Sequence, residues 1–444
     1  MNFTQYSYAF NVSTEIHDKA VNQDKAFCWH PFTRQSEWCD SAHEPIMIDR
    51  AKGVWLFDTK GNRYLDGNAS IWTNIHGHQR AEITNALQNQ LNKVAHSSYL
   101  GAGHPLASEL AERLVSFFPN SSLNRVFYSD NGSTAVECAL KMALQYRMQS
   151  GGEKRDEFVA FHSCYHGDTM GAASLGGVDT FFARFRKLGM KVNFVADLDE
   201  LKNLPSSVID RIAGVVIEPL VQGVNQIHVW EEGMLKELRA WTQEHNIHLI
   251  LDEVMTGFGR TGEMFACNNE GVVPDFLCLA KGLTGGYLPL AATLVTEEIY
   301  NAFLGSADKA FYYGHSYTAN PLGCAAALAS LEIFRKEQTL VAVREKSMLI
   351  GELLNLLKSK SPFIHEVRRC GMVSGIELRH EDGGRFPKDR RMGEKVCNAA
   401  RVYGLLTRPI LDTIVFLPPL SITRDEISFA FSAIESAILD VFPR

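Results

Sequence analysis

The chain contains the stretch Pro274-Asp-Phe-Leu-Cys-Leu-Ala-Lys281-Gly-Leu-Thr-Gly-Gly286, an apolar run that ends at one lysine and a glycine-rich turn. The apolar run predicts a buried strand with Lys281 at its carboxyl end. Because burial disfavours the ammonium form, we expect a lowered pKa and some neutral amine near neutral pH, as a Schiff-base lysine requires. The alternative, equally compatible with this stretch alone, is a lysine at a strand end whose ammonium group lies in water.

A second stretch, His248-Leu-Ile-Leu-Asp252-Glu-Val-Met-Thr-Gly-Phe-Gly-Arg260-Thr-Gly262, also has an apolar run that ends at a charged residue. Parallel strands that are buried on both faces have this pattern, and ligands bind beyond their carboxyl ends. We therefore expect Asp252 and Lys281 to share one crevice. A carboxylate near a lysine that carries an aldehyde cofactor favours pyridoxal phosphate, whose pyridine nitrogen needs an acidic partner. Considered by itself, Asp252 is better explained as a helix cap at the strand end.

Composition describes an ordinary globular protein. Of 444 residues, 45% are hydrophobic and 21% charged, and the formal net charge is −7, which gives no reason to expect a nucleic-acid or anionic-membrane partner. No apolar stretch approaches the roughly 18 residues of a membrane span, and residues 1–18 lack the pattern of a signal peptide. We expect a cytoplasmic protein.

The nine cysteines are scattered without a C-x-x-C pair, so neither a zinc site nor a disulfide framework is predicted. Cys138, Cys278 and Cys324 lie in apolar segments and are interpreted as core residues. His76 and His78 suggest a metal site only weakly, because no third ligand is evident, and we predict no metal.

Strands and helices alternate through the middle of the chain. Residues 46–66 predict a small antiparallel sheet, after an irregular segment of about 45 residues and before a loop at 69–77. The segments that follow are, in order, a helix at 81–94, a strand at 125–129, a helix to 149, strands at 158–161 and 213–217, a helix at 234–245, strands at 248–251 and 276–280, and a helix after Pro321. This alternation predicts an α/β fold with a mainly parallel sheet.

The pattern changes at about residue 335. A long helix, a strand pair around 371–378, a helix near 391–402 and a final helix from Arg424 indicate a second, α+β unit. We predict a large α/β domain at 77–334 and a smaller α+β domain built from both termini, residues 1–76 plus 335–444.

A glycine turn between a strand and a helix forms a candidate anion site. In Tyr128-Ser-Asp-Asn-Gly132-Ser133-Thr134-Ala-Val-Glu137, the spacing of Thr134 and Glu137 predicts a capping box. Free amides at such a helix N-terminus bind phosphate, Gly132 permits close approach, and Ser133 adds a hydroxyl donor. An ordinary capped helix explains the same residues.

Two further strand ends carry candidate residues. Tyr165, in Tyr-His-Gly-Asp-Thr, could stack on a planar cofactor, although a packed surface tyrosine is an equal alternative. Glu218, in Ile-Glu-Pro, could relay protons or be structural.

Taken together, these motifs resemble class III, fold-type I pyridoxal-phosphate aminotransferases. The series is Gly-Ser-Thr-Ala-Val-Glu, Tyr-His-Gly-Asp-Thr, Ile-Glu-Pro, Leu-Asp-Glu-Val-x-Thr-Gly-Phe-Gly-Arg-Thr-Gly, Ala-Lys-Gly and Gly314-His-Ser-Tyr-Thr-Ala-Asn-Pro321, in that order. The resemblance extends from about residue 29 to 419. It implies a homodimer in which each subunit completes the other's active site, and two half-reactions with ping-pong kinetics.

The resemblance also assigns roles to individual residues. It implies that Lys281 forms the Schiff base with pyridoxal phosphate and also serves as general acid and base, and that Asp252 pairs with the pyridinium nitrogen. Further cofactor contacts are implied for Gly132, Ser133 and Tyr165, and for His315 and Ser316 of the other subunit. Substrate contacts are implied for Trp72, Gly314 and Arg408, together with Phe32, Tyr165 and Lys281. The Arg408 guanidinium would bind a substrate carboxylate.

Within the class, the chain is most similar to the branch that acts in biotin biosynthesis. This similarity is carried by Trp29-His-Pro-Phe-Thr33, the Trp72 loop, Lys141-Met-Ala-Leu-Gln-Tyr146 and Tyr165-His-Gly-Asp-Thr169, and the turn Thr407-Arg-Pro409 agrees with it. It implies transfer of an amino group from S-adenosylmethionine to 8-amino-7-oxononanoate. Phe32 and His315 depart from residues found in many members and leave the donor open, so lysine is an alternative. An ω-amino acid:pyruvate aminotransferase and a non-enzymatic sensor are further alternatives.

Overall fold

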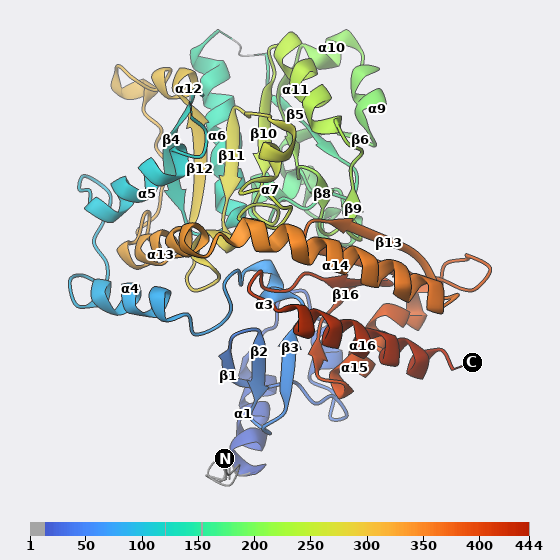
Figure 1. Cartoon of the computed structure of the whole chain (residues 1–444). Coiled ribbons are helices and arrows are strands. Elements are labelled where there is room, and N and C mark those ends of the chain that lie inside the picture. The colour runs from blue at the N-terminus through green and yellow to red at the C-terminus, as the bar shows by residue number, and fades with distance from the viewer. Residues whose placement is uncertain (1–13, 120, 152–153, 444) are drawn as a thin grey trace.

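The computed structural model describes residues 14–119, 121–151 and 154–443. Its centre is a seven-stranded sheet (Figure 1). The strand order is β4 (Leu123–Ser129), β12 (Ala291–Thr296), β11 (Phe276–Leu279), β10 (His248–Asp252), β7 (Ile212–Ile217), β5 (Glu157–Phe161) and β6 (Lys191–Val195). Only β12 runs antiparallel to its neighbours in this sheet. The predicted α/β class with a mainly parallel sheet is confirmed, whereas β6 and β12 were not predicted.

Helices cover both faces of this sheet. Along β5, Val159 and Phe161 join one hydrophobic cluster, and Phe158 and Ala160 join another, as alternation across a buried strand requires. The first cluster includes residues of α11 (Met234–Glu244), and the second includes residues of α6 (Gly132–Gln149). The sheet is therefore buried between α6 and α11, and its strand ends are the accessible places for polar side chains.

Described segments from the N-terminal and C-terminal parts of the chain together build the lower part of the molecule in Figure 1. One sheet contains β1 (Ile48–Lys52), β2 (Trp55–Asp58), β3 (Arg63–Asp66) and β15 (Leu405–Leu406), and another contains β13 (Ile364–Cys370), β14 (Val373–Leu378), β17 (Thr413–Phe416) and β16 (Pro409–Ile410). Leu65 of β3 pairs in parallel with Leu405 of β15. This pairing supports the division of the chain into two domains, which stays a prediction.

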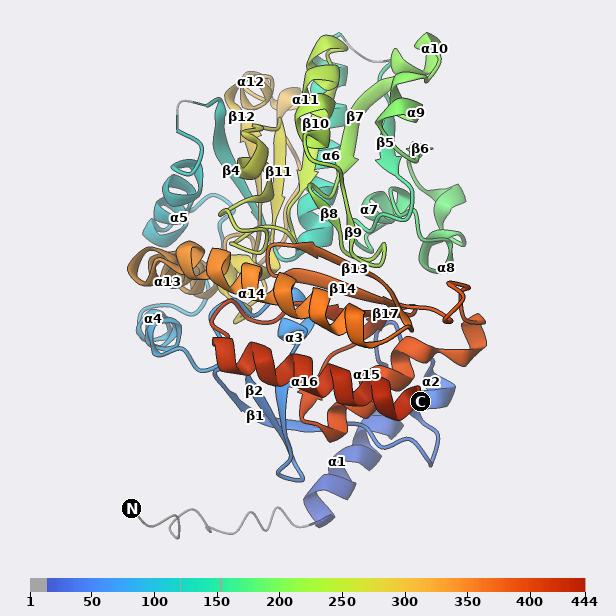
Figure 2. The same ribbon diagram turned by 45° about the vertical axis from the view of Figure 1, so that its right-hand side comes forward.

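Long helices connect the two parts. Figure 2 shows α14 (Thr339–Lys360) crossing the molecule between the large sheet and α16 (Arg424–Val441). The remaining helices and strands are α3 (Ala69–Trp72), α4 (Ala81–Leu91), α5 (Pro105–Val115), α7 (Met170–Ser174), α8 (Asp179–Phe182), α9 (Leu198–Lys202), α10 (Ser206–Ile209), α12 (Glu297–Asn301), α13 (Pro321–Glu337), α15 (Met392–Val402), β8 (Val221–Gln222) and β9 (His228–Val229). No helix of the described ranges is long and apolar enough to cross a membrane.

The expectation of an irregular N-terminal segment is wrong for part of its length. Residues 1–13, and most of the segment examined for a signal peptide, lie outside the described residues, but α1 (Thr14–Phe27) and α2 (Gln35–Trp38) are helical. The Lys25 ammonium of α1 donates to the carbonyls of Asp40 (2.7 Å) and His43 (2.6 Å), and His17 is 2.6 Å from the Thr59 hydroxyl. Contacts from distant segments, rather than a strong local pattern, stabilise α1.

Candidate active site

A narrow cavity lies where several strands of the large sheet end. Lys281 follows β11, Asp252 ends β10 and Glu218 follows β7. The cavity has a volume of about 100 Å³, and its lining is Trp72, Gly132, Ser133, Tyr165, His166, Gly167, Glu218, Asp252, Val254, Met255 and Lys281. The structure thus brings together the amine, the carboxylate and the helix N-terminus that the sequence indicated separately.

Lys281 has the properties of a reactive amine. Burial lowers its pKa to about 8, against the opposing influence of the Asp252 and Glu218 carboxylates and with a smaller contribution from the Arg260 charge. Its Nζ atom lies 4.7 Å from the centroid of the Trp72 ring, a distance at which a cation and an aromatic face attract one another. The expected lowering of the lysine pKa is confirmed, and the interpretation of a fully solvated ammonium group is wrong.

Asp252 is fixed by two hydrogen bonds. Its Oδ1 accepts from the backbone amide of Val254 at 3.1 Å, and its Oδ2 lies 2.8 Å from Nδ1 of the buried His166. Burial disfavours the imidazolium, but the neighbouring Cys164 and Asp252 raise the pKa of His166 well above its usual value. The Asp252 carboxyl group is thereby held in place, where its oxygens can accept a hydrogen bond from a ring nitrogen of a ligand.

Glu218 lies in the same cavity and orders its wall. Its carboxylate accepts from the amides of Tyr165 (3.1 Å) and Gly223 (2.8 Å). Burial raises its pKa to about 7, although the positive charge of His166 opposes this rise. Near neutral pH, this group can change protonation state within reach of the Lys281 charge.

The N-terminus of α6 supplies an anion site, but its cap differs from the predicted one. Asn131 is the N-cap and forms a reciprocal capping box with Thr134, whereas Glu137 accepts from the Thr169 hydroxyl (2.7 Å) and the Ala172 amide (3.1 Å). The Thr134–Glu137 prediction is wrong because Asn131, three residues before Thr134, precedes the first helical turn. Glu137 instead holds α7.

Ser133 and Gly132 suit close approach of an anion. The Ser133 Oγ accepts from the Asp168 amide at 3.0 Å, which leaves its hydroxyl hydrogen available to donate. A Cβ at position 132 would lie 2.6 Å from Cγ1 of Val254, so only glycine fits there without displacing that wall. The exposed amides of the first turn of α6 and the Ser133 hydroxyl can together bind a phosphate.

Aromatic side chains form the mouth of the cavity. The Tyr165 hydroxyl donates to Asp168 Oδ2 at 2.6 Å, and the Tyr165 ring makes an edge contact with Phe32, with 6.3 Å between ring centroids. Burial raises the pKa of Tyr165 above its usual value, so the phenol stays neutral. Phe32 is 59% exposed. The structure therefore places Phe32 beside Tyr165 and leaves its ring accessible to a substrate.

Trp72 lies on a strained turn rather than in the simple loop expected. The φ angles of Ala69, Ser70, Ile71 and Trp72 are 44°, 48°, 62° and 67°, all in the left-handed region. Such residues cost about 1–2 kcal/mol each relative to right-handed backbone. Asp66 accepts from the amide and hydroxyl of Ser70 at 2.9 and 2.8 Å, and these bonds partly offset that cost.

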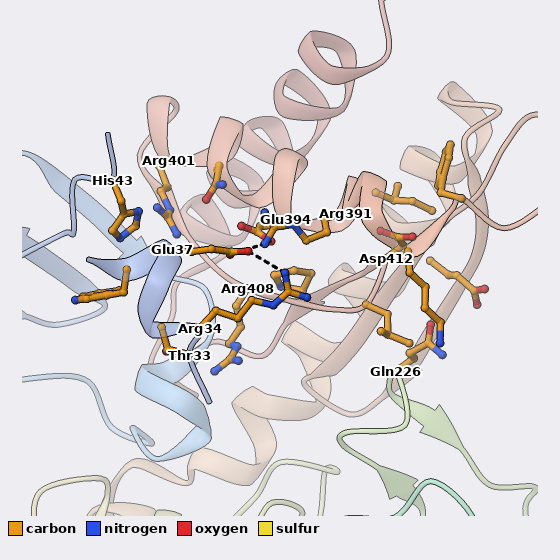
Figure 3. A pocket seen from close by; sticks show the side chains of 18 of the residues that line it. Thr33, Arg34, Glu37, His43, Gln226, Arg391, Glu394, Arg401, Arg408 and Asp412 are labelled. Carbon is orange, nitrogen blue, oxygen red and sulfur yellow. Dashed lines mark hydrogen bonds and ion pairs between the residues drawn. The ribbon is translucent and has the colours of Figure 1, made fainter. Parts of the chain in front are cut away.

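Arg408 lies in a second, larger cavity. This cavity has a volume of about 730 Å³, and Arg34, Glu37, Arg391, Arg401 and Asp412 are among its other lining residues (Figure 3). Glu37 is paired there with both Arg34 and Arg391, whereas Arg408 forms no ion pair with a described residue. Thr33 belongs to this larger cavity, and its neighbour Phe32 contacts Tyr165 of the first cavity. The turn at residues 32–33 therefore lies between the two cavities.

The segment at 314–316 does not line the Lys281 cavity of its own chain. Gly314 and Ser316 are exposed, and His315 Nε2 lies 2.9 Å from Asp130 Oδ1, next to the N-terminus of α6. The geometry of one chain therefore leaves the predicted contacts from the other subunit untested. His76 contacts Ser330 (3.0 Å) and His78 contacts Asp66 (3.2 Å), and no group of His, Cys, Asp and Glu within the described part of the chain could hold a metal ion.

Two residues near the cavity received no role from the sequence. His166 stands directly after Tyr165 in the loop that follows β5, and its place in Tyr-His-Gly-Asp-Thr was a usable signal. Arg260 stands in the glycine-rich segment after Asp252, and its side chain is completely buried. Only the three-dimensional structure shows which groups these two side chains contact.

Comparisons with known proteins agree with this site. Residues 38–438 match the family described as aminotransferase class-III. A protein from Geobacter sulfurreducens named adenosylmethionine-8-amino-7-oxononanoate aminotransferase is 44% identical, and the alignment covers 94% of this chain and 96% of that protein. The crystal structure of the enzyme of the same name from Methanocaldococcus jannaschii has a TM-score of 0.92 and 40% identity, with 95% of this chain and 99% of that chain covered.

An amine transaminase from an uncultivated Pseudomonas species, solved in its PLP-bound form, is also similar in structure. The TM-score is 0.87 at 33% sequence identity, and the match covers 93% of this chain and 98% of that chain. The agreement extends over nearly the whole chain and includes the elements that carry Lys281 and Asp252. The chain therefore belongs to the class-III aminotransferase family.

Proposed function

We propose that this protein is a pyridoxal-phosphate-dependent aminotransferase of biotin biosynthesis, which transfers an amino group from S-adenosylmethionine to 8-amino-7-oxononanoate. The observation that carries the proposal is the convergence of Lys281, Asp252 and the N-terminus of α6 on one cavity. The names and extensive similarity of the relatives from Geobacter sulfurreducens and Methanocaldococcus jannaschii support the choice of substrates.

The residues of the cavity fit pyridoxal phosphate by their chemistry. Lys281 supplies an amine that reacts with an aldehyde, Asp252 supplies a carboxylate for the pyridine nitrogen, and Gly132 and Ser133 supply donors for the phosphate. Tyr165 supplies an aromatic face at the cavity wall. When bound, the cofactor supplies an electron sink for the charge that develops on a substrate carbon.

The protein contributes the proton transfers and the positioning. The Lys281 Nζ atom, once free, takes a proton from the α-carbon of the donor and later delivers one to the carbon of the acceptor. His166 holds the Asp252 carboxyl group in position, and the apolar Trp72 and Met255 limit access of water. These roles predict ping-pong kinetics, because donor and acceptor use the same amine in turn.

Substrate recognition involves the mouth of the cavity and the larger cavity beside it. Arg408 would bind the terminal carboxylate of 8-amino-7-oxononanoate, and Phe32, Tyr165 and Trp72 would contact the apolar chain. Within a homodimer, His315 and Ser316 of the partner subunit would complete the phosphate site, and Gly314 would lie against the substrate. All nine cysteines are free thiols, which suits a reducing, cytoplasmic location.

A single-donor assay tests the proposal. Purified protein is loaded with pyridoxal phosphate, candidate donors are added one at a time, and the visible absorbance of the Lys281-bound cofactor is followed. Loss of this band with S-adenosylmethionine and its return with 8-amino-7-oxononanoate are expected. A response to lysine instead would identify lysine as the donor, and a response to alanine alone would identify an ω-amino acid:pyruvate aminotransferase. Protein that binds no cofactor would contradict the proposal.

A further inference from the structure

Cys28 and Cys39 are the two exposed cysteines of the chain, whereas Cys370 is half-buried and the other six are buried. Burial raises the pKa of the Cys370 thiol to about 11 and that of the Cys397 thiol to about 12. Because the thiolate is the form that attacks a disulfide, such cysteines react slowly. Thiol chemistry on this chain is therefore directed to positions 28 and 39.

Both exposed thiols lie against the last turn of α1. The Cys28 amide donates to the Asp24 carbonyl at 2.9 Å and continues the helical pattern of α1. Burial opposes the change, but hydrogen bonds from the side chains of Trp38, His30 and Cys28 hold the pKa of Asp24 below its usual value. The Cys39 thiol, directly after α2, donates to the Lys25 carbonyl at 3.5 Å. The two thiols therefore contact consecutive residues of one helical turn.

Further bonds on both sides of Cys39 hold its backbone close to α1. The Trp38 indole donates to Asp24 Oδ2 at 2.8 Å, and the Lys25 ammonium donates to the carbonyl of Asp40 at 2.7 Å. Asp24 and Lys25 stand four and three positions before Cys28, and residues at these spacings share a helix face. A disulfide needs Cα atoms about 4.4–6.8 Å apart, and these contacts hold the two cysteines side by side.

The segment between the two cysteines carries the turn at the mouth of the Lys281 cavity. Phe32 has a φ of 51°, in the left-handed region, and its ring centroid lies 5.3 Å from that of Phe181. Thr33 and Glu37 line the larger cavity (Figure 3), where Glu37 pairs with Arg391 at 2.8 Å. A bond between positions 28 and 39 would close a loop that contains this whole turn.

We propose that Cys28 and Cys39 form a thiol modification site, which reacts with a low-molecular-weight disulfide such as oxidised glutathione to give an intrachain disulfide that restrains the turn at residues 32–33. Cytosolic disulfides of this kind are transient and respond to redox state. The modification is independent of the substrates assigned above, since it requires neither cofactor nor turnover.

The reaction proceeds by two exchanges. One cysteine thiolate attacks the small disulfide, forms a mixed disulfide and releases one small thiolate. The second cysteine thiolate then attacks the protein sulfur of the mixed disulfide and releases the other small thiolate. Two protein thiols are oxidised by two electrons, the small disulfide is reduced to two thiols, and the two cysteine protons pass to the released thiolates.

The experiment uses purified full-length protein in mixtures of reduced and oxidised glutathione, followed by alkylation and digestion with trypsin. Cleavage after Lys25, Arg34 and Arg50 places the two cysteines on separate peptides, residues 26–34 and 35–50. Mass spectrometry then detects the disulfide as a linked pair of peptides. We expect at least roughly tenfold more of this pair in oxidised than in reduced glutathione.

Brief digestion of the folded protein measures the restraint. Arg34 is an exposed trypsin site inside the loop, and cleavage there requires local opening of the chain. We expect the disulfide to slow this cleavage about threefold or more, because it removes open conformations of the loop. Cys28→Ser and Cys39→Ser should each leave the other cysteine as a mixed disulfide with glutathione and cleavage unslowed. Cys370→Ser is the control and should behave like the wild type.

Glutathione adducts on Cys28 and Cys39 without a linked pair would overturn the proposal, and so would a bond from either residue to a third cysteine. A covalent dimer on a non-reducing gel would place the bond between chains and overturn it as well. A linked pair with unchanged cleavage at Arg34 would reject the restraint of the turn. None of these outcomes depends on whether the protein is an aminotransferase.

Discussion

His166 and Asp252 form a buried hydrogen-bonded pair, with 2.8 Å between Nδ1 and Oδ2. Replacement of the imidazole by a ring of similar size, in His166→Phe, would leave one oxygen of a buried carboxylate without its partner. We expect the dissociation constant for pyridoxal phosphate to rise roughly tenfold. The measurement is quenching of intrinsic fluorescence during titration of cofactor-free protein. His162→Phe, an exposed position four residues earlier, is the control, and equal effects of both changes would contradict the assigned role.

The reactivity of Lys281 should follow its pKa of about 8. The neutral amine is the reactive form, so the rate of cofactor attachment is expected to rise about tenfold per pH unit below that value and to level off above it. Stopped-flow absorbance measures this rate. Lys281→Ala should give no borohydride-stable adduct at this position. A midpoint near the ordinary lysine value of 10.5 would show that burial does not control the amine.

Glu218→Gln should move the same profile to lower pH. The Glu218 carboxylate raises the pKa of Lys281, and its removal leaves the amine easier to deprotonate. We expect the midpoint to fall by about half a unit to one unit. Glu244→Gln changes an exposed carboxylate and serves as the control. A shift toward higher pH would reverse the sign of the interaction and reject this account of the cavity.

Arg408→Ala tests the proposed carboxylate site. The substitution removes a charged, bidentate contact and its binding free energy. We therefore expect the KM for 8-amino-7-oxononanoate to rise roughly 10- to 100-fold, with a smaller change in kcat. Steady-state kinetics at saturating donor measure both constants. Arg385→Ala alters another exposed cation of the same cavity. If both variants raised KM equally, the cavity would attract the substrate by its general charge and not through Arg408.

Asn131→Ala should weaken the start of α6. Loss of an N-cap side chain costs about 1 kcal/mol, which corresponds to a fall in Tm of about 2 °C. Calorimetry of cofactor-free protein measures the change, and Glu137→Gln provides the comparison, because Glu137 bonds α7 and not the helix start. An unchanged Tm for Asn131→Ala would contradict the assignment of Asn131 as the residue that caps α6.

The sequence predicted those parts of the fold whose signals are local. The apolar runs that became β10 and β11 are continuous, and the charged residue after each run marks the carboxyl edge of a parallel sheet. Asp252 and Lys281 could therefore be placed in one crevice from the sequence alone. Cys138, Cys278 and Cys324 were also correctly assigned to the core, because each lies in an apolar segment.

Other features depend on contacts that no local pattern reveals. The antiparallel direction of β12 is set by its pairing with β4 and β11, and α1 is stabilised by acceptors near residues 40–43. The left-handed turn at residues 69–72 contains no glycine, so its conformation could not be inferred from residue type. The sequence around Arg260 shows only a polar residue in a glycine-rich segment. Its burial could not be predicted, because the carbonyl groups to which it donates belong to residues 74 and 418.

The parallel pairing of Leu65 with Leu405 separates two strand partners by 340 positions. A ribosome that adds about 5–20 residues per second needs roughly 20–70 s to supply the second partner after the first has emerged. During that interval the β3 edge of the N-terminal hairpin has no partner strand. Its unpaired backbone groups can then form hydrogen bonds with other chains, which leads to aggregation. Synthesis with abundant chaperone, which covers such an edge during this interval, should therefore improve the yield of native protein.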